Sequence, residues 1–227
     1  MPAKKIIREP RWPALIAMLA AGGVYLGMPE PLSVGPSWGL FAVILVLLIP
    51  IMVAHSRGYF KMARILTLAG NGVITLAMIA SLFFLIQGLP RHREPPNALL
   101  RSAAALWLTN VLVFALWYWK LDAGGPQGRD SSRGRLDSSF LFPQMLSQGA
   151  NSMGRGTQDG HEDHDWHGPM WSPNFMDYLF LAFNTSTAFS PTDTAVLSRW
   201  AKAGMMIQSL ISLTIVALLA ARAVNVL

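Results

Sequence analysis

The residues that could do the most distinctive chemistry lie in a hydroxyl-rich stretch near the C-terminus. A short apolar run, too short to cross a bilayer, begins at Asp177 and ends in Thr185, Thr187, Ala188, Phe189, Ser190, Pro191, Thr192 and Asp193. Oxygen atoms at membrane depth can replace part of the water shell of an ion. Non-helical backbone is tolerated there only when it is buried in protein or lines a watery cavity. The pattern therefore predicts a re-entrant pore loop before a spanning helix over 201–227.

Other interpretations of this stretch stay open. Thr and Ser hydroxyls also cap helix ends, so the stretch could be a plain helix hairpin. Asp193 could contribute to an acidic ring at a pore mouth, or it could N-cap a helix over 194–200. Asp177 stands near the start of the short run and suits the positive end of a helix dipole.

A second candidate site contains His161, His164 and His167, with acidic residues between them. Imidazole and carboxylate ligands at this spacing suit zinc, nickel or copper. The same imidazoles could instead titrate near neutral pH and act as a sensor. The flanking glycines and proline favour a third interpretation, a solvated loop. No nucleophile or substrate pocket accompanies the histidines, so we expect neither an enzyme nor a cofactor.

The composition places the chain in a membrane. Of its 227 residues, 52% are hydrophobic and only 13% are charged, whereas a soluble domain carries roughly 25% charged residues. The mean hydropathy is +0.38. The absence of cysteine from the sequence excludes disulfides and thiol catalysis, and no basic face is available for nucleic acid. We expect a multi-pass protein of the cell (plasma) membrane, in contact with membrane lipid.

Apolar runs of the length that a bilayer requires, about 20 residues, occupy 38–54, 65–87, 99–121 and 201–227. A weaker run over 12–28 follows a basic start, so a signal peptide is its alternative. The predicted fold is an all-α integral membrane protein with about five transmembrane helices plus a re-entrant pore helix and loop.

Polar residues are rare inside these runs. Asn71, Asn110 and Gln208 are expected to join helices by hydrogen bonds rather than to carry a substrate. The segment 122–172 is rich in Gly, Ser, Asp and Arg and shows no helical period except around 140–142. We expect it to be a loop that is flexible in its middle.

Residues 182–193 resemble the pore segment of the potassium-channel superfamily, which reads roughly S-F-x-T-x-T-T-V-G-Y-G-D. Phe183, Thr185, Thr187 and Asp193 fall on matching positions. The resemblance implies a homotetramer that conducts monovalent cations. It also implies a channel-like pore domain over 91–227, after about three N-terminal transmembrane helices over 1–90. Within the pore domain, the outer helix is 99–121, the long polar loop 122–172, the pore helix and loop 173–193, and the inner helix 201–227.

The whole chain also resembles a family of bacterial membrane proteins that share the run Thr-Ala-Phe-Ser-Pro-Thr-Asp and the stretch Ala-Leu-Trp-Tyr-Trp. This second resemblance implies a bacterial inner membrane and no function.

The departure from the channel pattern concerns the filter itself. Ser190 and Thr192 replace the two filter glycines, and Pro191 lies between them. Left-handed backbone costs a residue with a Cβ roughly 1–2 kcal/mol, so two such positions in four subunits would cost about 8–16 kcal/mol. Pro191 also fixes its own φ. We therefore expect a wider, hydroxyl-lined mouth that selects weakly among cations, with a non-conducting scaffold or sensor as the alternative.

Charge and resemblance disagree on orientation. The positive-inside rule favours a cytoplasmic N-terminus, because seven basic residues then lie inside: Lys4, Lys5, Arg8, Arg11, Arg57, Lys61 and Arg64. The opposite orientation places only Arg91, Arg93 and Arg101 inside. The channel resemblance favours a cytoplasmic C-terminus, and the sequence expectation follows the resemblance.

Overall fold

The computed structural model describes residues 12–29, 35–88, 96–129, 137–147, 171–187 and 193–224. Helix α1 (Trp12–Val24) continues into the 3-10 turn η1 (Tyr25–Gly27), and α2 (Gly39–Ser56) and α3 (Phe60–Gly88) follow. Next come α4 (Pro96–Leu121), the turn η4 (Asp122–Gly124) and α5 (Pro126–Arg129). Strand β1 (Phe140–Leu141) precedes a helical turn over 143–147. The C-terminal part holds α8 (Phe175–Thr187), β2 (Ala195–Val196) and α9 (Arg199–Val224).

Four helices of the described chain are long and apolar enough to cross a membrane. They cover Gly39–Ser56, Lys61–Gly88, Asn97–Gly124 and Arg199–Ala221. The helix Trp12–Gly27 is shorter, so the fifth crossing stays a prediction. The prediction of an all-α chain with several spanning-length helices is confirmed at this level.

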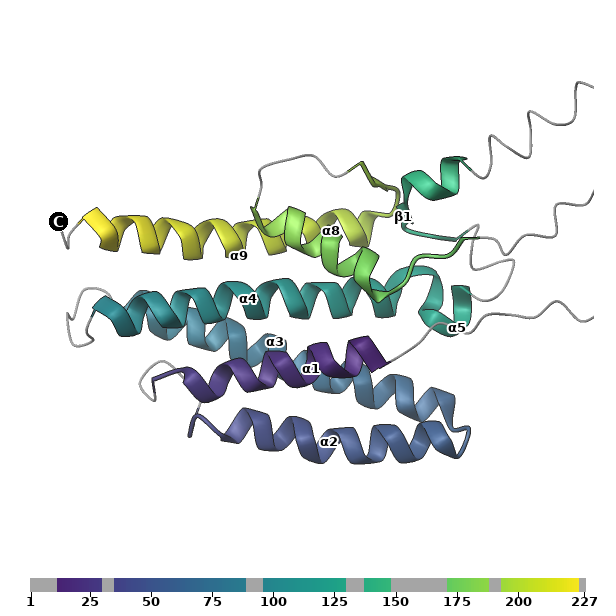
Figure 1. Cartoon of the computed structure of the whole chain (residues 1–227), viewed down its shortest axis with the longest axis horizontal. Coiled ribbons are helices and arrows are strands. Elements are labelled where there is room, and N and C mark those ends of the chain that lie inside the picture. Colours follow the sequence, from purple (N-terminus) through teal and green to yellow (C-terminus); the bar gives the residue numbers. More distant parts are fainter. Residues whose placement is uncertain are drawn as a thin grey trace, which may run out of the picture.

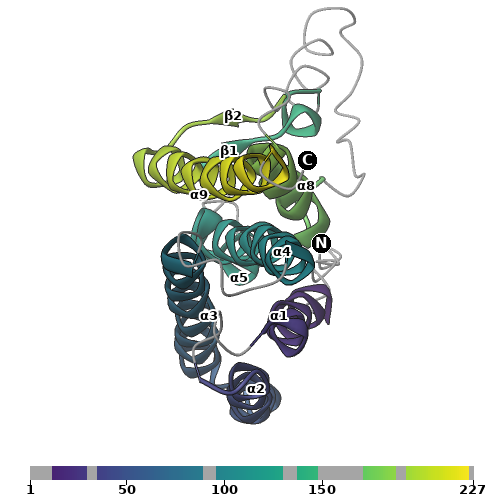
Figure 2. The ribbon, with the colours of Figure 1, turned by 90° about the vertical axis from the view of Figure 1, so that its left-hand side faces the viewer.

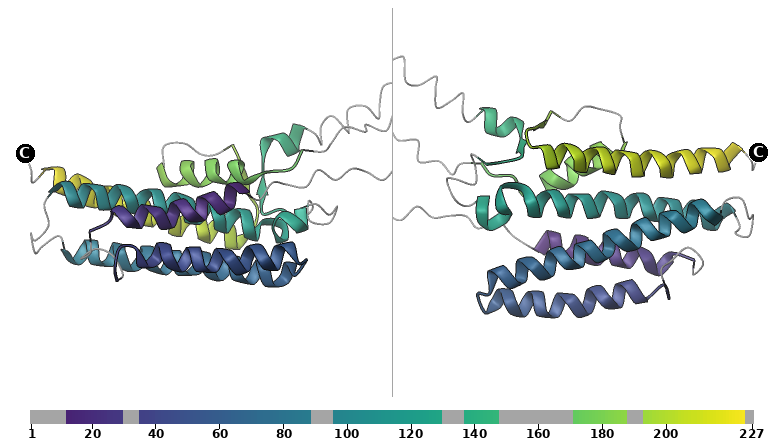
Figure 3. Two further views of the ribbon diagram at one scale, coloured as in Figure 1. Left: turned by 60° about the horizontal axis from the view of Figure 1, so that its bottom comes forward. Right: turned by 180° about the vertical axis from the view of Figure 1, so that it is seen from behind.

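The long helices lie along one axis, and successive helices reverse direction (Figures 1 and 3). One end of the bundle carries the α2–α3 turn, α5, and the starts of α8 and α9. We call it the α5 end. Helix α9 runs from this end to the opposite one, where the described chain stops.

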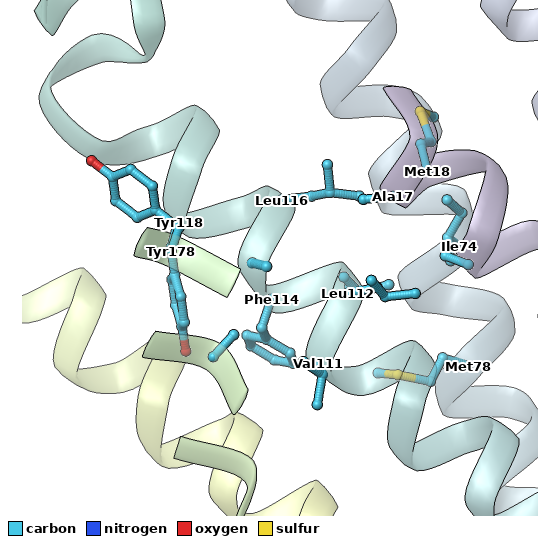
Figure 4. Packing of buried hydrophobic residues seen from close by; sticks show 14 of the residues in the cluster. Ala17, Met18, Ile74, Met78, Val111, Leu112, Phe114, Leu116, Tyr118 and Tyr178 are labelled. Carbon is cyan, nitrogen blue, oxygen red and sulfur yellow. The ribbon is translucent and has the colours of Figure 1, made fainter. Parts of the chain in front are cut away.

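Helix α4 is the centre of the bundle. It lies between α8 and α9 on one side and α1 and α3 on the other (Figure 2). Of its spanning window, 61% is buried, against 17% to 33% for the other three. Leu112 and Leu116 of α4 point toward Met18 of α1 and Ile74 of α3 (Figure 4). The outer helices present large apolar side chains instead, such as Leu76 at 70% exposed, as lipid-facing helices do.

The described ends of the segment 122–172 carry regular structure, and they include the stretch 140–142, which the sequence expectation had set apart from the loop. Strands β1 and β2 pair antiparallel, with Phe140 opposite Val196 and Leu141 opposite Ala195. Phe140 is fully buried and makes edge-on ring contacts with Tyr118 at 5.3 Å and Trp200 at 5.9 Å. This aromatic burial, which helical periodicity does not reveal, holds β1 against α4 and α9. The middle of the segment lies outside the described residues.

Most of the basic residues of the described helices and turns lie at the α5 end. This group comprises Arg57, Lys61, Arg64, Lys120, Arg129, Arg199 and Lys202, placed there by the element ends that carry them. At the opposite end, the described helices carry two such residues, Arg101 near the start of α4 and Arg222 near the end of α9. Because loops rich in Lys and Arg stay in the cytoplasm, we infer that the α5 end faces the cytoplasm, against the expectation from the channel resemblance.

A reporter fused to Leu227 tests this orientation. Because α9 leads away from the α5 end, we expect a phosphatase that works only outside the cytoplasm to be active at Leu227. A fluorescent protein that matures only in the cytoplasm should stay dark at the same position. Fusions after Gly58, in the α2–α3 turn, should give the reverse pattern and serve as the control. Fluorescence at Leu227 would contradict the inference and support the opposite orientation.

Candidate functional site

Helix α8 begins where two side chains cap its first turn. Asn174 Oδ1 accepts a hydrogen bond from Met176 N at 2.8 Å, and Asp177 Oδ2 accepts one from Asn174 N at 2.7 Å. This reciprocal arrangement satisfies backbone donors that have no partner within the helix. Partial burial raises the pKa of Asp177, and the hydrogen bond from Asn174 offsets part of that effect. The predicted place of Asp177 at the positive end of the helix is confirmed.

The buried carboxylate of Asp122 ties the start of α8 to the end of α4. It accepts hydrogen bonds from Tyr178 Oη at 2.5 Å, from Ser139 N at 2.6 Å and from Ser138 Oγ at 3.1 Å. Asp122 and Tyr178 are both fully buried. The Ser138 hydroxyl also lies 2.8 Å from the Phe140 carbonyl, so its single hydrogen is shared. The donors Tyr178 and Ser139, with this shared third one, offset the cost of removing the carboxyl from water. The start of α8, the strand β1 and the end of α4 therefore form one unit.

The chain turns sharply after Asp122 so that α5 can close this end. Ala123, Gly124 and Gly125 have φ values of 51°, 79° and 84°. A left-handed conformation costs Ala roughly 1–2 kcal/mol, whereas glycine adopts it readily. The turn brings Arg129 back over α4, where its Nη1 donates to the carbonyl of Trp119 at 2.8 Å. The last turn of α4 thus receives a charged cap.

Gln208 of α9 is the hub of a second buried network. Its Oε1 accepts a hydrogen bond from Tyr118 Oη at 2.6 Å. Its Nε2 donates to the Ala182 carbonyl at 2.7 Å and to Ser186 Oγ at 2.8 Å. One fully buried amide therefore joins α4, α8 and α9. The predicted role of Gln208 in helix packing is confirmed.

Two neighbouring contacts extend this network. Asn110 Nδ2 donates to the Gln208 carbonyl at 3.2 Å and to Ser212 Oγ at 2.8 Å. Ser209 Oγ donates to the Thr185 carbonyl at 3.2 Å. The last turns of α8 are thus fixed to α9 by side-chain hydrogen bonds in an otherwise apolar layer.

The partners of α8 show how deep this helix reaches. Tyr178 meets Asp122 at the end of α4, whereas Ser186 meets Gln208, nine residues after Arg199. At 1.5 Å per residue, Gln208 lies roughly 14 Å along α9 from its start. The hydrocarbon core of a bilayer is about 30 Å thick. Helix α8 therefore ends near the middle of the bundle, and β2 lies back at the α5 end (Figure 1).

Two of the predicted pore residues are described at the end of α8. The hydroxyl of Thr185 donates to the Leu181 carbonyl at 2.8 Å, and that of Thr187 donates to the Asn184 carbonyl at 3.0 Å. Thr185 is buried, at 8% exposed. Both hydroxyl hydrogens are therefore engaged within α8, and only the oxygen lone pairs stay available to a ligand. Ala188, Phe189, Ser190, Pro191 and Thr192 lie outside the described residues.

Asp193 is exposed and does not cap a helix over 194–200, so that interpretation is wrong. Ala195 and Val196 form β2 because they pair with β1. Helix α9 begins only at Arg199, and Ser198 Oγ accepts a hydrogen bond from Ala201 N at 3.4 Å. The inner helix thus starts two residues before the predicted 201–227.

The histidine cluster, His161, His164 and His167, lies outside the described residues. Within the described ranges, no group of three or more His, Asp or Glu side chains could hold a metal ion. Comparisons with protein-family models, with curated proteins and with solved structures find no match for this chain.

The sequence did not reveal two buried polar pairs: Asp122 with Tyr178, and Ser139 with Trp200. Asp122 stands at the end of an apolar run, where an acidic residue normally faces water, and no local pattern announces its burial. Trp200 Nε1 donates a hydrogen bond to Ser139 Oγ at 3.0 Å, across 61 positions of sequence. Such pairs are found only once β1 and β2 are known to meet.

Replacing Gln208 with leucine should destabilise the protein. The substitution leaves the buried Tyr118 hydroxyl and Ser186 hydroxyl without Gln208, at a cost of about 1–3 kcal/mol. Thermal unfolding of the purified protein in detergent should show a lower midpoint. Thr214→Val is the matched control, because Thr214 Oγ1 donates only to the Leu210 carbonyl of its own helix in the described contacts. Equal midpoints for the two variants would contradict the assigned role of Gln208.

Proposed function

We propose that α4, α8 and α9 form the pore domain of a weakly selective cation channel, assembled from four copies of the chain. The observation that supports this most is the end of α8 at mid-depth, beside α9 and fixed there by Gln208. A helix that enters a membrane and stops halfway exposes backbone groups that must face protein or water. An ion path supplies that water.

The end of α8 has the right charge for a cation. The last four carbonyls of a helix have no partner within it, and the aligned peptide dipoles give a helix C-terminus roughly half a negative charge. Ser186 and Thr187 contribute carbonyls of this kind, whereas the Asn184 carbonyl accepts a hydrogen bond from the Thr187 hydroxyl at 3.0 Å. Ser209 occupies the Thr185 carbonyl only in part, because a carbonyl oxygen accepts two hydrogen bonds. Four α8 ends around one axis would concentrate cations at the bundle centre.

The uncovered side of α9 leaves room for other copies. Met206, Leu210, Leu213 and Val216 are between 49% and 67% exposed, and only 17% of the spanning window of α9 is buried. These side chains need either lipid or protein against them. In the proposed tetramer, part of this face packs on neighbouring copies around the axis, and the rest meets lipid.

Weak selectivity follows from the filter residues. Potassium selectivity requires closely spaced rings of backbone carbonyls around the ion. Ser190 and Thr192 resist the left-handed backbone angles that glycine adopts readily. The ring of Pro191, between them, locks its own φ angle. Hydroxyls of Ser190 and Thr192 can replace some water around either sodium or potassium. The proposed filter therefore separates the two ions poorly.

A non-conducting membrane scaffold is the second candidate. The specific observation in its favour is that the hydroxyls of Thr185 and Thr187 donate to carbonyls of α8 itself. Such bonds stabilise a helix end with no ion present. A scaffold with the same architecture would use α8 only to join α4 and α9.

Conductance of the purified protein in planar bilayers separates the two candidates. We expect sodium and potassium conductances within a factor of about three, because hydroxyls replace only part of the ion's water shell. Asp193→Asn should lower cation conductance at 0.02 M salt and leave it nearly unchanged at 1 M, where charges are screened within about 3 Å. Asp137→Asn, an equal charge change at an exposed site of the same end, should have a smaller effect.

Three outcomes would overturn the proposal or a part of it, each in a different way. Strong preference for potassium over sodium would refute the argument about Ser190, Pro191 and Thr192 and leave a channel. Electrical silence across a range of voltage, pH and metal ions, with the protein intact, would favour the scaffold. A monomer in solution-mass measurements would exclude a four-fold pore.

A further inference from the structure

A cavity opens among α1, α2, α3 and α4 at the α5 end, away from α8 and α9. Its volume is about 90 Å³. The apolar wall includes Met18 of α1, Ile51 of α2 and Leu116 of α4, and all three side chains are buried in the described fold. The hydrogen-bond networks of α8 do not include these residues, so the pore proposal does not account for the cavity.

The rim of the cavity is basic. Arg64 of α3 and Lys120 of α4 line it together with His55 of α2. Among its lining residues, all of which belong to the described chain, none is Asp or Glu. Arg64 and Lys120 are half-buried, which reduces the screening of their charges by salt. The rim therefore suits an anion.

The position of the rim in the bundle indicates that the anion is a lipid headgroup. Arg64 is the fourth residue of the spanning segment Lys61–Gly88, and Lys120 stands four residues before the end of Asn97–Gly124. Both charges thus lie where a spanning helix meets lipid headgroups, and the apolar wall continues from them toward the bilayer interior. Basic pockets between transmembrane helices on the cytoplasmic side bind anionic lipid headgroups.

We propose that this cavity binds one anionic phospholipid, with its phosphate between Arg64 and Lys120 and the start of an acyl chain against Met18 and Ile51. The site is independent of the proposed pore. It joins the N-terminal helices to α4 through a lipid, and it lies at the end of the bundle that we infer to be cytoplasmic, where anionic lipids concentrate.

Titration of the detergent-solubilised full chain with dimyristoyl phosphatidylglycerol tests the proposal, with the shift in unfolding midpoint as the readout. We expect a saturable upward shift, and a much smaller one with dimyristoyl phosphatidylcholine, which has no net charge. Because each basic residue near an anionic lipid contributes roughly fivefold, the double substitution Arg64→Gln, Lys120→Gln should weaken the apparent affinity by about thirtyfold. The lipid-dependent shift should also shrink as sodium chloride rises.

Arg199→Gln, Lys202→Gln is the matched control. It removes the same charge from the same end of the bundle, but these residues are exposed on α9 and outside the cavity. We expect this variant to bind phosphatidylglycerol as the native chain does. Equal loss in both double variants, or equal shifts with the two lipids, would overturn the proposal.

Inorganic phosphate separates a lipid site from a site for soluble anions. We expect no midpoint shift with phosphate at the concentration at which phosphatidylglycerol saturates. A phosphate shift that the Arg64, Lys120 double variant abolishes would overturn the lipid assignment in favour of a soluble phosphorylated ligand. If the double variant does not fold, the salt and headgroup dependence of the native chain decides by itself.

Discussion

A polar group buried among apolar helices must find its partners inside the protein, and this constraint organises the C-terminal half of the chain. Gln208 can donate twice and accept through its amide, and all of these capacities are used between α4, α8 and α9. At the bundle end, the carboxylate of Asp122 accepts hydrogen bonds from Tyr178 and Ser139. Polar contacts near both ends of α8, at Tyr178 and at Ser186, therefore set its depth and angle. The surrounding apolar contacts are less directional and do not select one position along α4 by themselves.

The sequence carries the helical part of the fold because a spanning helix has a simple signature. Runs of apolar residues near 20 in length predict α2, α3, α4 and α9, and the structure agrees within a few residues. Polar residues inside such runs are costly unless they are paired, which explains why Asn110 and Gln208 were predictable as helix contacts. The run that forms α8 was also recognisable in the sequence, as an apolar stretch too short to cross a bilayer.

Non-local contacts are the part that the sequence does not reveal. The pairing of β1 with β2 joins residues more than fifty positions apart and rests on the burial of Phe140. The same contact moves the start of α9 to Arg199 and removes Asp193 from the role of helix cap. The basic rim of Arg64 and Lys120 likewise comes from two helices that meet only in the folded bundle. Local sequence patterns identify candidate residues, but which of these residues contact one another depends on how the helices and strands pack.

The central claim is that α8 starts at the α5 end and stops at mid-depth, and that the chain is back at the α5 end at β2. The pore proposal rests on this claim. The chain contains no cysteine, so single-cysteine variants in sealed vesicles can test this with a thiol reagent that does not cross membranes. We expect Met176→Cys, in the first turn of α8, and Leu197→Cys, after β2, to react from the same side as Tyr59→Cys in the α2–α3 turn. Asn97→Cys, at the other end of α4, should react only from the opposite side. Labelling of Met176→Cys and Leu197→Cys from opposite sides would mean that α8 crosses the membrane and would contradict the account.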